Sequence, residues 1–246
     1  MIKIIAVGNS FSQDATTYLD RICESAGIDV YVRNLYIGGC ELALHHSNLE
    51  SDRTYEYQTR GIHTDKRTTL KNGLACEKWD IVTFQQASHH SGIEETYYPY
   101  INELSKYVNE ILPGAKQYIH ETWAYEIDST HPHFVNYNND QLYMYNALKA
   151  AYENAAKSIG APLIPCGDVI QLLRTKAPFD YKNGGLSLCR DGFHLSLDYG
   201  RYTAGAVWYE ALLGKDVRKS TYAPEGTDAA LISLIRETVH EICNNK

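Results

Sequence analysis

The chain has 246 residues, 44% of them apolar and 22% charged, a composition typical of a globular protein with a sizeable core. Its net charge of −7 argues against a general affinity for phosphate backbones, so nucleic acid is not an expected partner. The 6 cysteines include no C-x-x-C pair, which argues against a zinc ribbon or a dense disulfide framework. No linker divides the sequence, and we expect a single domain over residues 1–246.

The compartment is predicted from what the sequence lacks. No apolar run approaches the roughly 20 residues that cross a bilayer, and the first residues lack the basic and apolar regions of a signal peptide. We therefore expect a cytoplasmic protein without a membrane partner, or a secreted or periplasmic one if a signal peptide has been trimmed. The sequence leaves the oligomeric state open.

The first third of the chain begins with an apolar strand. Residues 2–7 form this strand, which ends at Gly8 and is followed by Asn9 and Ser10. A helix is expected over residues 14–26, and an alternating strand over 28–36 leads to Gly38 and Gly39. We expect a short helix over 41–49 and a small hairpin or irregular excursion over 53–62. A buried strand over 79–84 then runs into the polar segment 85–92.

The rest of the chain continues the alternation of strands and helices. We expect helices over 100–112, 140–159, 168–173, 199–213 and 228–243, strands over 116–120 and 162–165, and loops over 121–138 and 186–197. Strand and helix alternate about five times. This order predicts an α/β fold, a three-layer αβα sandwich of the flavodoxin-like type with about five parallel strands and helices on both faces.

Ser10 follows the first strand, where α/β proteins bind their ligands. A serine hydroxyl needs a neighbouring base to act as a nucleophile, commonly a histidine oriented by a carboxylate. Asp191 and His194 are the candidates, because they lie three residues apart near the end of the chain. The carboxylate could then hold one ring nitrogen while the other faces Ser10.

These short motifs resemble the SGNH (GDSL-like) hydrolase superfamily. G-N-S follows the first strand, a glycine pair the second, and D-x-x-H lies near the end, so the resemblance runs through the whole chain in order. It implies that Ser10, Asp191 and His194 form a catalytic triad. It also implies an oxyanion hole made by the serine N–H, a glycine N–H after the second strand, which we assign to Gly39 with Gly38 as the alternative, and an amide after the third.

Two positions depart from the usual pattern of this superfamily. Asn9 replaces the aspartate of G-D-S, and Gln85-Gln86 replaces the expected asparagine block after the third strand. A glutamine amide offers the same N–H donor on a longer arm, and sugar-esterase branches of the superfamily carry glutamine there. We therefore assign the third donor to Gln85, with Gln86 as the alternative.

Each candidate also has a structural interpretation. Ser10 could cap a helix, His194 could be a structural histidine, and the two glutamines could belong to a polar loop. The histidines His45-His46, His89-His90, His120, His131 and His133 raise the possibility of a metal site. Adjacent histidines on a strand point apart and no recognised ligand spacing is present, so we expect neither a metal nor a cofactor.

Trp123 and Tyr125 follow the fourth strand and are expected near the site, where flat rings could bind a sugar or simply pack the loop. The sequence thus predicts a serine esterase that hydrolyses a short acyl ester, with acetyl the first choice, of a carbohydrate or other small polar molecule. The alternatives are a non-catalytic carbohydrate-binding protein on the same scaffold and a metal-dependent hydrolase.

Overall fold

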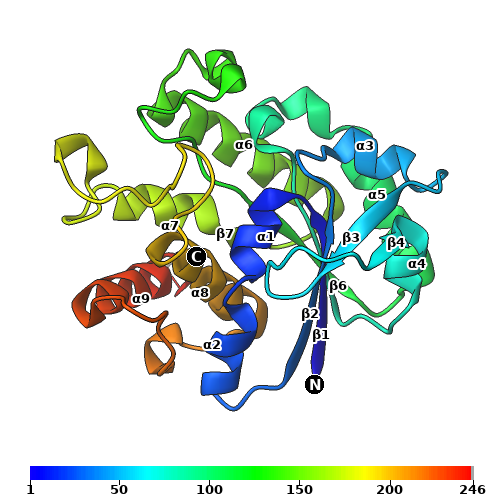
Figure 1. Cartoon of the computed structure of the whole chain (residues 1–246). Coiled ribbons are helices and arrows are strands. Elements are labelled where there is room, and N and C mark those ends of the chain that lie inside the picture. Colours follow the sequence, from blue (N-terminus) through cyan, green and yellow to red (C-terminus); the bar gives the residue numbers. More distant parts are fainter. Residues whose placement is uncertain (245–246) are drawn as a thin grey trace.

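A mixed β-sheet forms the centre of the molecule (Figure 1). The computed structural model describes residues 1–244. Within that range the sheet has the strand order β4-β3-β2-β1-β5-β6-β7. The strands are β1 (Ile2–Gly8), β2 (Val30–Tyr36), β3 (Thr54–Gln58), β4 (Arg67–Thr69), β5 (Ile81–Phe84), β6 (Lys116–Glu121) and β7 (Leu163–Pro165). The expectation of about five parallel strands did not include the antiparallel strands β3 and β4.

The strands that carry the site run parallel to one another. β1 pairs in parallel with β2 and β5, β5 with β6, and β6 with β7, whereas β3 and β4 form an antiparallel edge. β1 lies between two parallel neighbours and buries Ile4, Ile5 and Val7, as its continuous apolar sequence requires. The antiparallel pair extends well beyond the hairpin expected over 53–62. β4 was not expected, because its sequence Arg-Thr-Thr has no apolar pattern.

The helices pack in two groups on the sheet (Figure 1). One group comprises α1 (Ser10–Thr16), α2 (Leu19–Ser25), α7 (Cys166–Leu173), α8 (Tyr199–Leu213) and α9 (Ala229–Asn244), and the other α3 (Leu42–Ser47), α4 (Leu70–Ala75), α5 (Tyr100–Ile111) and α6 (Gln141–Ile159). No helix in residues 1–244 is long and apolar enough to cross a membrane.

The helix predicted over residues 14–26 is two helices, and the first begins four residues early at Ser10. The early start has a local cause, since the Asn9 side chain accepts the Phe11 N–H at 3.0 Å and so caps the helix. The break follows two threonines, Thr16 and Thr17, whose hydroxyls bond carbonyl oxygens of the preceding turn. Such bonds compete with the helical ladder and bend helices.

The long loop after β6 is more ordered than the sequence suggested. It contains the 3₁₀ helix η3 (Pro132–Tyr137) and a buried ion pair in which Arg174 lies 3.5 Å from Glu126. Glu126 also accepts bonds from Gln141 at 2.7 Å and Ser187 at 2.8 Å. These contacts hold the loop against α6, α7 and the segment that precedes His194.

A buried carboxylate joins α1 to the segment before α8. Asp14, with no exposed surface, accepts bonds from Arg190 at 3.1 Å and from Arg201 at 2.8 Å. It also accepts the backbone N–H of Leu195 at 2.9 Å. Because Asp14 lies one turn beyond Ser10, these bonds fix the position of residues 190–195 relative to the start of α1.

Replacing Asp14 by Ala leaves two partly buried guanidinium groups without their partner. We expect the free energy of unfolding, measured by urea denaturation, to fall by about 3–5 kcal/mol, the usual result of breaking a buried ion pair. The matched control is Glu153→Ala, which removes an exposed partner 3.7 Å from Lys149 and should cost less than about 1 kcal/mol. Equal losses in the two variants would show that Asp14 does not fasten this segment.

Candidate active site

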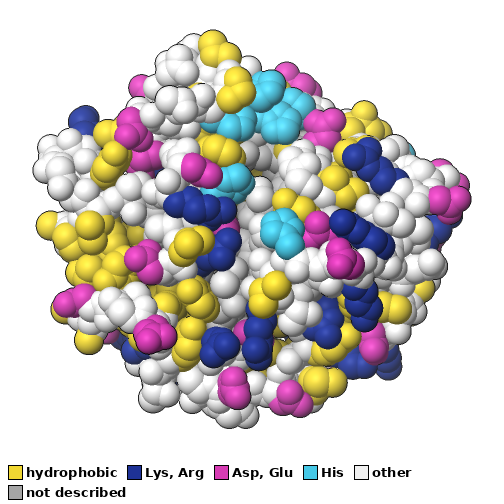
Figure 2. Space-filling view, viewed as in Figure 1, with side chains coloured by type: hydrophobic (Ala, Val, Ile, Leu, Met, Phe, Trp, Pro, Cys, Tyr) yellow, Lys and Arg dark blue, Asp and Glu magenta, His cyan; other side chains and the backbone are white. Residues whose placement is uncertain are grey.

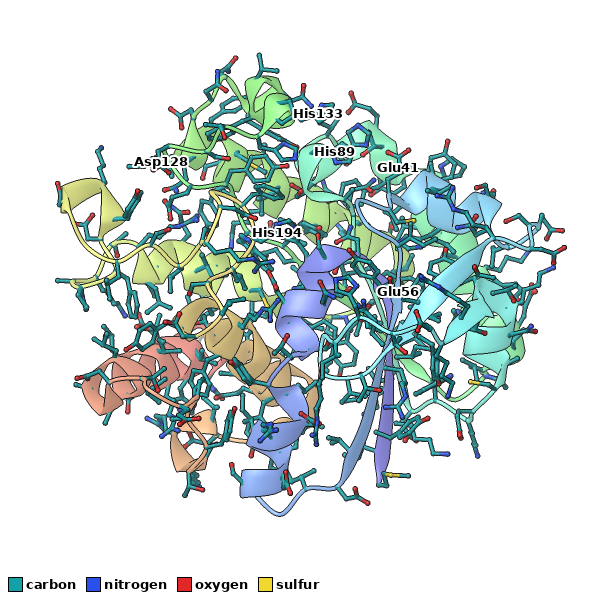
Figure 3. The ribbon with its side chains drawn as sticks, in the orientation of Figure 1. Glu41, Glu56, His89, Asp128, His133 and His194 are labelled. Carbon is teal, nitrogen blue, oxygen red and sulfur yellow. The ribbon has the colours of Figure 1, made fainter. Side chains whose placement is uncertain are left out.

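Titratable side chains gather over the carboxyl ends of the parallel strands. Figure 2 shows histidines collected on this face, and Figure 3 places His194 before α8, His133 in η3 and Glu41 before α3. His89 lies in the short 3₁₀ helix η1 (Ser88–His90), directly after β5. Segments far apart in the chain therefore meet at the edge where parallel α/β sheets bind ligands.

Ser10 is the first residue of α1 and comes directly from the end of β1. Asn9 before it is extended and buried, while Ser10 is only partly buried. The change from strand to helix thus leaves the Ser10 hydroxyl accessible on the face of the molecule that carries the histidines. As a first-turn residue, Ser10 also has a backbone N–H without a partner inside the helix.

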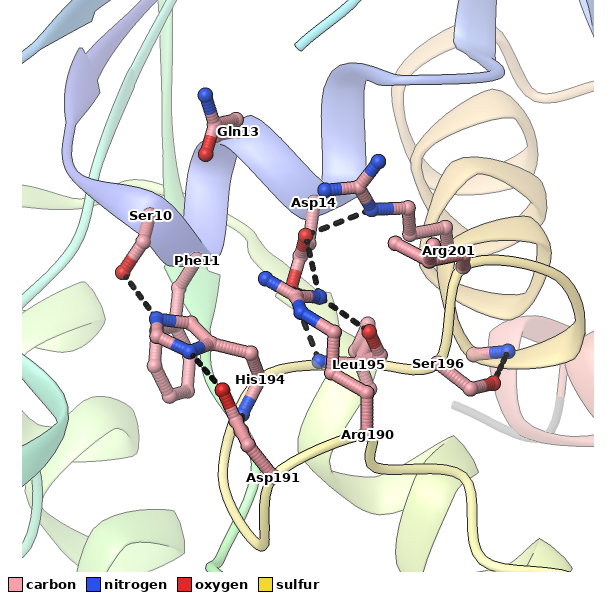
Figure 4. A network of polar contacts seen from close by, with 12 residues as sticks. Ser10, Phe11, Gln13, Asp14, Arg190, Asp191, His194, Leu195, Ser196 and Arg201 are labelled. Atoms are coloured by element: carbon pink, nitrogen blue, oxygen red, sulfur yellow. Dashed lines mark hydrogen bonds and ion pairs between the residues drawn. The ribbon is translucent and has the colours of Figure 1, made fainter.

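Ser10, His194 and Asp191 form a continuous hydrogen-bonded row (Figure 4). His194 Nε2 lies 2.8 Å from Ser10 Oγ, and His194 Nδ1 lies 2.7 Å from Asp191 Oδ2. Since an ionised carboxylate can only accept, it selects the tautomer with the proton on Nδ1 and leaves Nε2 to accept from the serine. The arrangement can take the serine proton during attack on a carbonyl.

The Asp191 carboxylate is held in its charged form. Partial burial alone would raise its pKa, but bonds from the His194 ring and from the backbone N–H groups of His194 and Phe193 outweigh burial and lower the pKa. Those backbone bonds measure 2.7 and 3.2 Å and both reach Asp191 Oδ1. Gly192 lies within this tight turn at a φ of +84°, a conformation that favours glycine.

Residues 190–195 are fastened from several sides. The backbone N–H of Glu126 donates to the Gly192 carbonyl at 2.7 Å, and Trp123 Nε1 donates to the Phe193 carbonyl at 2.7 Å. Asp14 binds the other side of the segment between Arg190 and Arg201, as Figure 4 shows. His194 therefore lies in a loop that hydrogen bonds hold in place from several sides.

Trp123 and Tyr125 lie near the site but have no exposed surface. Trp123 stacks on Phe11 with ring centroids 4.3 Å apart, and the Tyr125 hydroxyl lies 2.9 Å from Ser88 Oγ. Their ring faces are covered by protein, which does not support the expected role as a stacking surface for sugar. Both side chains instead pack beneath the loops that carry Phe193 and Ser88.

The glycine pair lies in an exposed turn after β2, in which the Cys40 N–H donates to the Ile37 carbonyl at 3.2 Å. Gly39 has a φ of +62°. Among residues 1–244 no acceptor takes the Gly39 N–H. Asn9 Nδ2 donates to the Cys40 carbonyl at 3.0 Å, which holds this turn beside the residue that precedes Ser10.

The two glutamines after β5 have different surroundings. Gln85 Nε2 donates to Asn9 Oδ1 at 2.7 Å, and Gln85 Oε1 lies 2.9 Å from His120 Nδ1. Gln86 turns away: its Oε1 accepts the backbone N–H of Leu42 at 3.0 Å, and its Nε2 donates to Thr96. Of the two glutamines, Gln85 is therefore the one whose side-chain amide is hydrogen-bonded to Asn9, at the start of α1.

The orientation of the Gln85 amide follows from the backbone. Asn9 must direct Oδ1 at the Phe11 N–H and Nδ2 at the Cys40 carbonyl, so only an N–H of Gln85 can meet Asn9 Oδ1. Gln85 Oε1 then accepts from His120. Burial lowers the pKa of His120 to about 3, which keeps this imidazole neutral.

The structural roles of Asn9, Asp14 and His120 were not predicted from the sequence. Asn9 was treated as a tolerated replacement, whereas its side chain contacts the ends of three strands through Phe11, Gln85 and Cys40. The only sequence signal for His120 was a polar residue near the end of an otherwise buried strand. No local pattern indicated that Asp14 would meet residues almost 180 positions away.

Comparisons with known proteins identify the family. The profile of DUF4886, a domain of unknown function, matches residues 3–242. A crystal structure of a DUF4886 family protein from Bacteroides uniformis ATCC 8492 is 38% identical, covers 98% of this chain and 93% of its own, and superposes with a TM-score of 0.89. A search of curated proteins finds no match.

Two structures of lower sequence identity show similarity in fold only. A predicted SGNH hydrolase from Slackia heliotrinireducens has a TM-score of 0.58 at 23% identity, over 86% of this chain and 98% of that one. A catalytic mutant of an acetylxylan esterase from Geobacillus stearothermophilus has a TM-score of 0.52 at 12% identity, over 87% and 93%. The chain belongs to the DUF4886 family and has the fold of these SGNH hydrolases.

Proposed function

We propose that this protein is a serine esterase, a divergent SGNH hydrolase on a flavodoxin-like three-layer scaffold. The observation that carries the proposal is the row from Ser10 through His194 to Asp191, with contacts of 2.8 and 2.7 Å. A nucleophile, a base and a group that orients the base are the parts that acyl transfer by serine requires. A protein that only binds carbohydrate would not need all three of these groups, so their presence together disfavours a purely carbohydrate-binding role.

The reaction proceeds in two halves. Ser10 Oγ attacks the ester carbonyl while His194 Nε2 takes the hydroxyl proton, and the resulting imidazolium is stabilised by Asp191. As the tetrahedral intermediate collapses, His194 gives that proton to the leaving alcohol and an acyl-serine remains. A water molecule then attacks the acyl carbon with His194 again as base, which releases the acid and restores Ser10.

The oxyanion formed in each half is stabilised by the N–H groups of Ser10, Gly39 and the Gln85 side chain. Gln85 uses one N–H for Asn9, and its second N–H serves the oxyanion. The bond to His120 prevents the amide from turning its oxygen toward the negative charge. Each such donor contributes about 3 kcal/mol to transition-state stabilisation.

The substrate is a short acyl ester, with acetyl as the first choice, of a carbohydrate or another small polar alcohol. Two features support this class. A structural neighbour is an acetylxylan esterase, and the face around His194 carries several imidazole and carboxylate groups, which suit a polar alcohol better than a lipid chain.

Ser10→Ala removes the nucleophile. Hydrolysis of p-nitrophenyl acetate should fall by about three orders of magnitude or more, and a fluorophosphonate should no longer label the protein. In the unaltered protein, mass spectrometry should locate the adduct on Ser10. Ser47→Ala, which changes a hydroxyl on α3 bonded to the Leu44 carbonyl, is the matched control and should keep both properties. A folded wild-type protein without an adduct on Ser10 contradicts the assignment.

Asp191→Asn keeps the shape of the side chain but replaces the acceptor that selects the Nδ1–H tautomer of His194. We expect kcat to fall by about 10³–10⁴-fold with little change in KM. Asp128→Asn is the matched control, because Asp128 is a carboxylate on the same face that bonds the Tyr181 hydroxyl instead. A similar kcat in both variants would remove Asp191 from the mechanism.

Gln85→Ala removes the amide donor and should lower kcat by about a hundredfold. Gln86→Ala is the comparison, since its amide is committed to Leu42 and Thr96; it should lower the unfolding temperature more than kcat. If kcat falls only in the Gln86 variant, the third donor is Gln86.

A further inference from the structure

Three ligand-type side chains converge beside the proposed active site. The potential ligand atoms of Glu41, His89 and His90 all lie within 4.8 Å of one another, and each residue is half-buried. Glu41 comes from the loop between β2 and α3, and the two histidines come from η1 after β5. Glu41 follows β2 and His89 follows β5, the two strands on either side of β1, and Figure 3 shows both residues near His133.

The convergence of His89 and His90 depends on η1. Adjacent histidines were expected to point apart because they would do so on a strand, but here they lie in a 3₁₀ turn held by the bond from the His90 N–H to the Ala87 carbonyl at 2.9 Å. The two ring centroids are only 4.2 Å apart. The structure therefore overturns the reason for excluding these residues as joint ligands.

The contact between His90 and Glu41 lacks the geometry of a hydrogen bond. His90 Nδ1 lies 2.6 Å from Glu41 Oε2, yet within residues 1–244 this buried nitrogen has no hydrogen-bond partner. Two electron-rich atoms at this separation repel unless a positive charge lies close to both. Either a proton on His90 Nδ1, which makes the contact an ion pair, or a shared metal cation relieves that repulsion.

We propose that Glu41, His89 and His90 bind a divalent transition-metal ion of the Zn²⁺ type. Imidazole nitrogen and carboxylate oxygen are ligands that Zn²⁺ accepts at about 2.0–2.2 Å, and three protein ligands leave one position open. His133, whose ring centroid is 5.0 Å from that of His89, is an additional imidazole close to these ligands. Nitrogen-rich donor sets favour Zn²⁺ over Ca²⁺ or Mg²⁺.

The site borders the proposed esterase centre without belonging to it. A row of ring contacts of 4.1–5.7 Å runs from His194 through Phe193, His131 and His133 to His89. No step of ester hydrolysis passes through the ion. Metal binding at this site is therefore independent of whether Ser10 is a nucleophile.

A second group of this kind, Glu210, Asp216 and His240, lies far from the active site and is already saturated. Glu210 Oε1 accepts from His240 Nδ1 at 2.7 Å and Glu210 Oε2 accepts the Val217 N–H at 3.0 Å. Asp216 is paired with the Arg218 guanidinium at 2.9 Å, whose charge repels a cation. This group serves as a built-in comparison.

The test uses the full chain without an affinity tag, stripped with EDTA. Zn²⁺ is titrated against a chromogenic chelator, and Co²⁺ is added separately to record visible absorption bands, which are strong in four-coordinate sites. We expect one Zn²⁺ per chain. His89→Ala and the near-isosteric Glu41→Gln should each weaken binding at least tenfold and abolish the strong Co²⁺ bands.

Two control variants separate this site from other His–carboxylate pairs. His63→Ala alters a single histidine paired with Glu56 at 2.9 Å, and His240→Ala alters the second group; both should bind Zn²⁺ as the unaltered chain does. Thermal unfolding verifies that each variant is folded. Failure to bind Zn²⁺, binding that survives both His89→Ala and Glu41→Gln, or binding lost in His240→Ala would each overturn the proposal.

Discussion

The side chain of Asn9 joins the carboxyl ends of three parallel strands. It caps the helix that follows β1, donates to the turn after β2 and accepts from Gln85 after β5. A buried amide must satisfy both its donor and its acceptor sides, and here every partner comes from a segment that the proposed chemistry uses. Asn9 thus links Ser10, the proposed nucleophile, to the segments that carry two of the proposed oxyanion donors. An aspartate at this position could not donate to the Cys40 carbonyl.

A separate set of contacts, centred on Asp14, holds the segment that carries His194, the proposed base. Asp14 has no exposed surface, and a buried carboxylate charge is costly unless it is neutralised. Two arginines and a backbone N–H neutralise it, all from residues 190–201. The C-terminal part of the chain therefore docks on α1 by satisfying a charge, whereas Asn9 organises the strand ends by neutral hydrogen bonds.

Much of the fold could be predicted because its helices and strands depend on the regular spacing of apolar residues along the chain. The buried strands, the long helices and the α/β class follow from it, and the residues after the strands follow from the rule for parallel sheets. β4 escaped prediction because Arg67-Thr68-Thr69 pairs through its backbone and carries no apolar signal. The break between α1 and α2 comes from threonine hydroxyls that bond the helix backbone.

Burial of individual rings was harder to predict. The sequence placed Trp123 and Tyr125 close to the strand ends but could not decide between binding a sugar and packing the loop, because their burial depends on how residues 126–139 and 190–195 fold over them. The convergence of His89 and His90 likewise requires a 3₁₀ turn that no local pattern announces. These contacts are tertiary and join segments that are remote in sequence.

The pairing of Ser10 with His194 bridges 184 positions of the chain. During synthesis, Ser10 is made 184 residues before the histidine that it contacts. Contacts of such large sequence separation form late, because the entropy cost of closing a long loop must be met before the contact stabilises the fold. A partly made or prematurely ended chain can thus build β1 and its neighbouring strands yet lack the histidine that faces Ser10, so the contact between Ser10 and His194 arises only after residue 194 has been made.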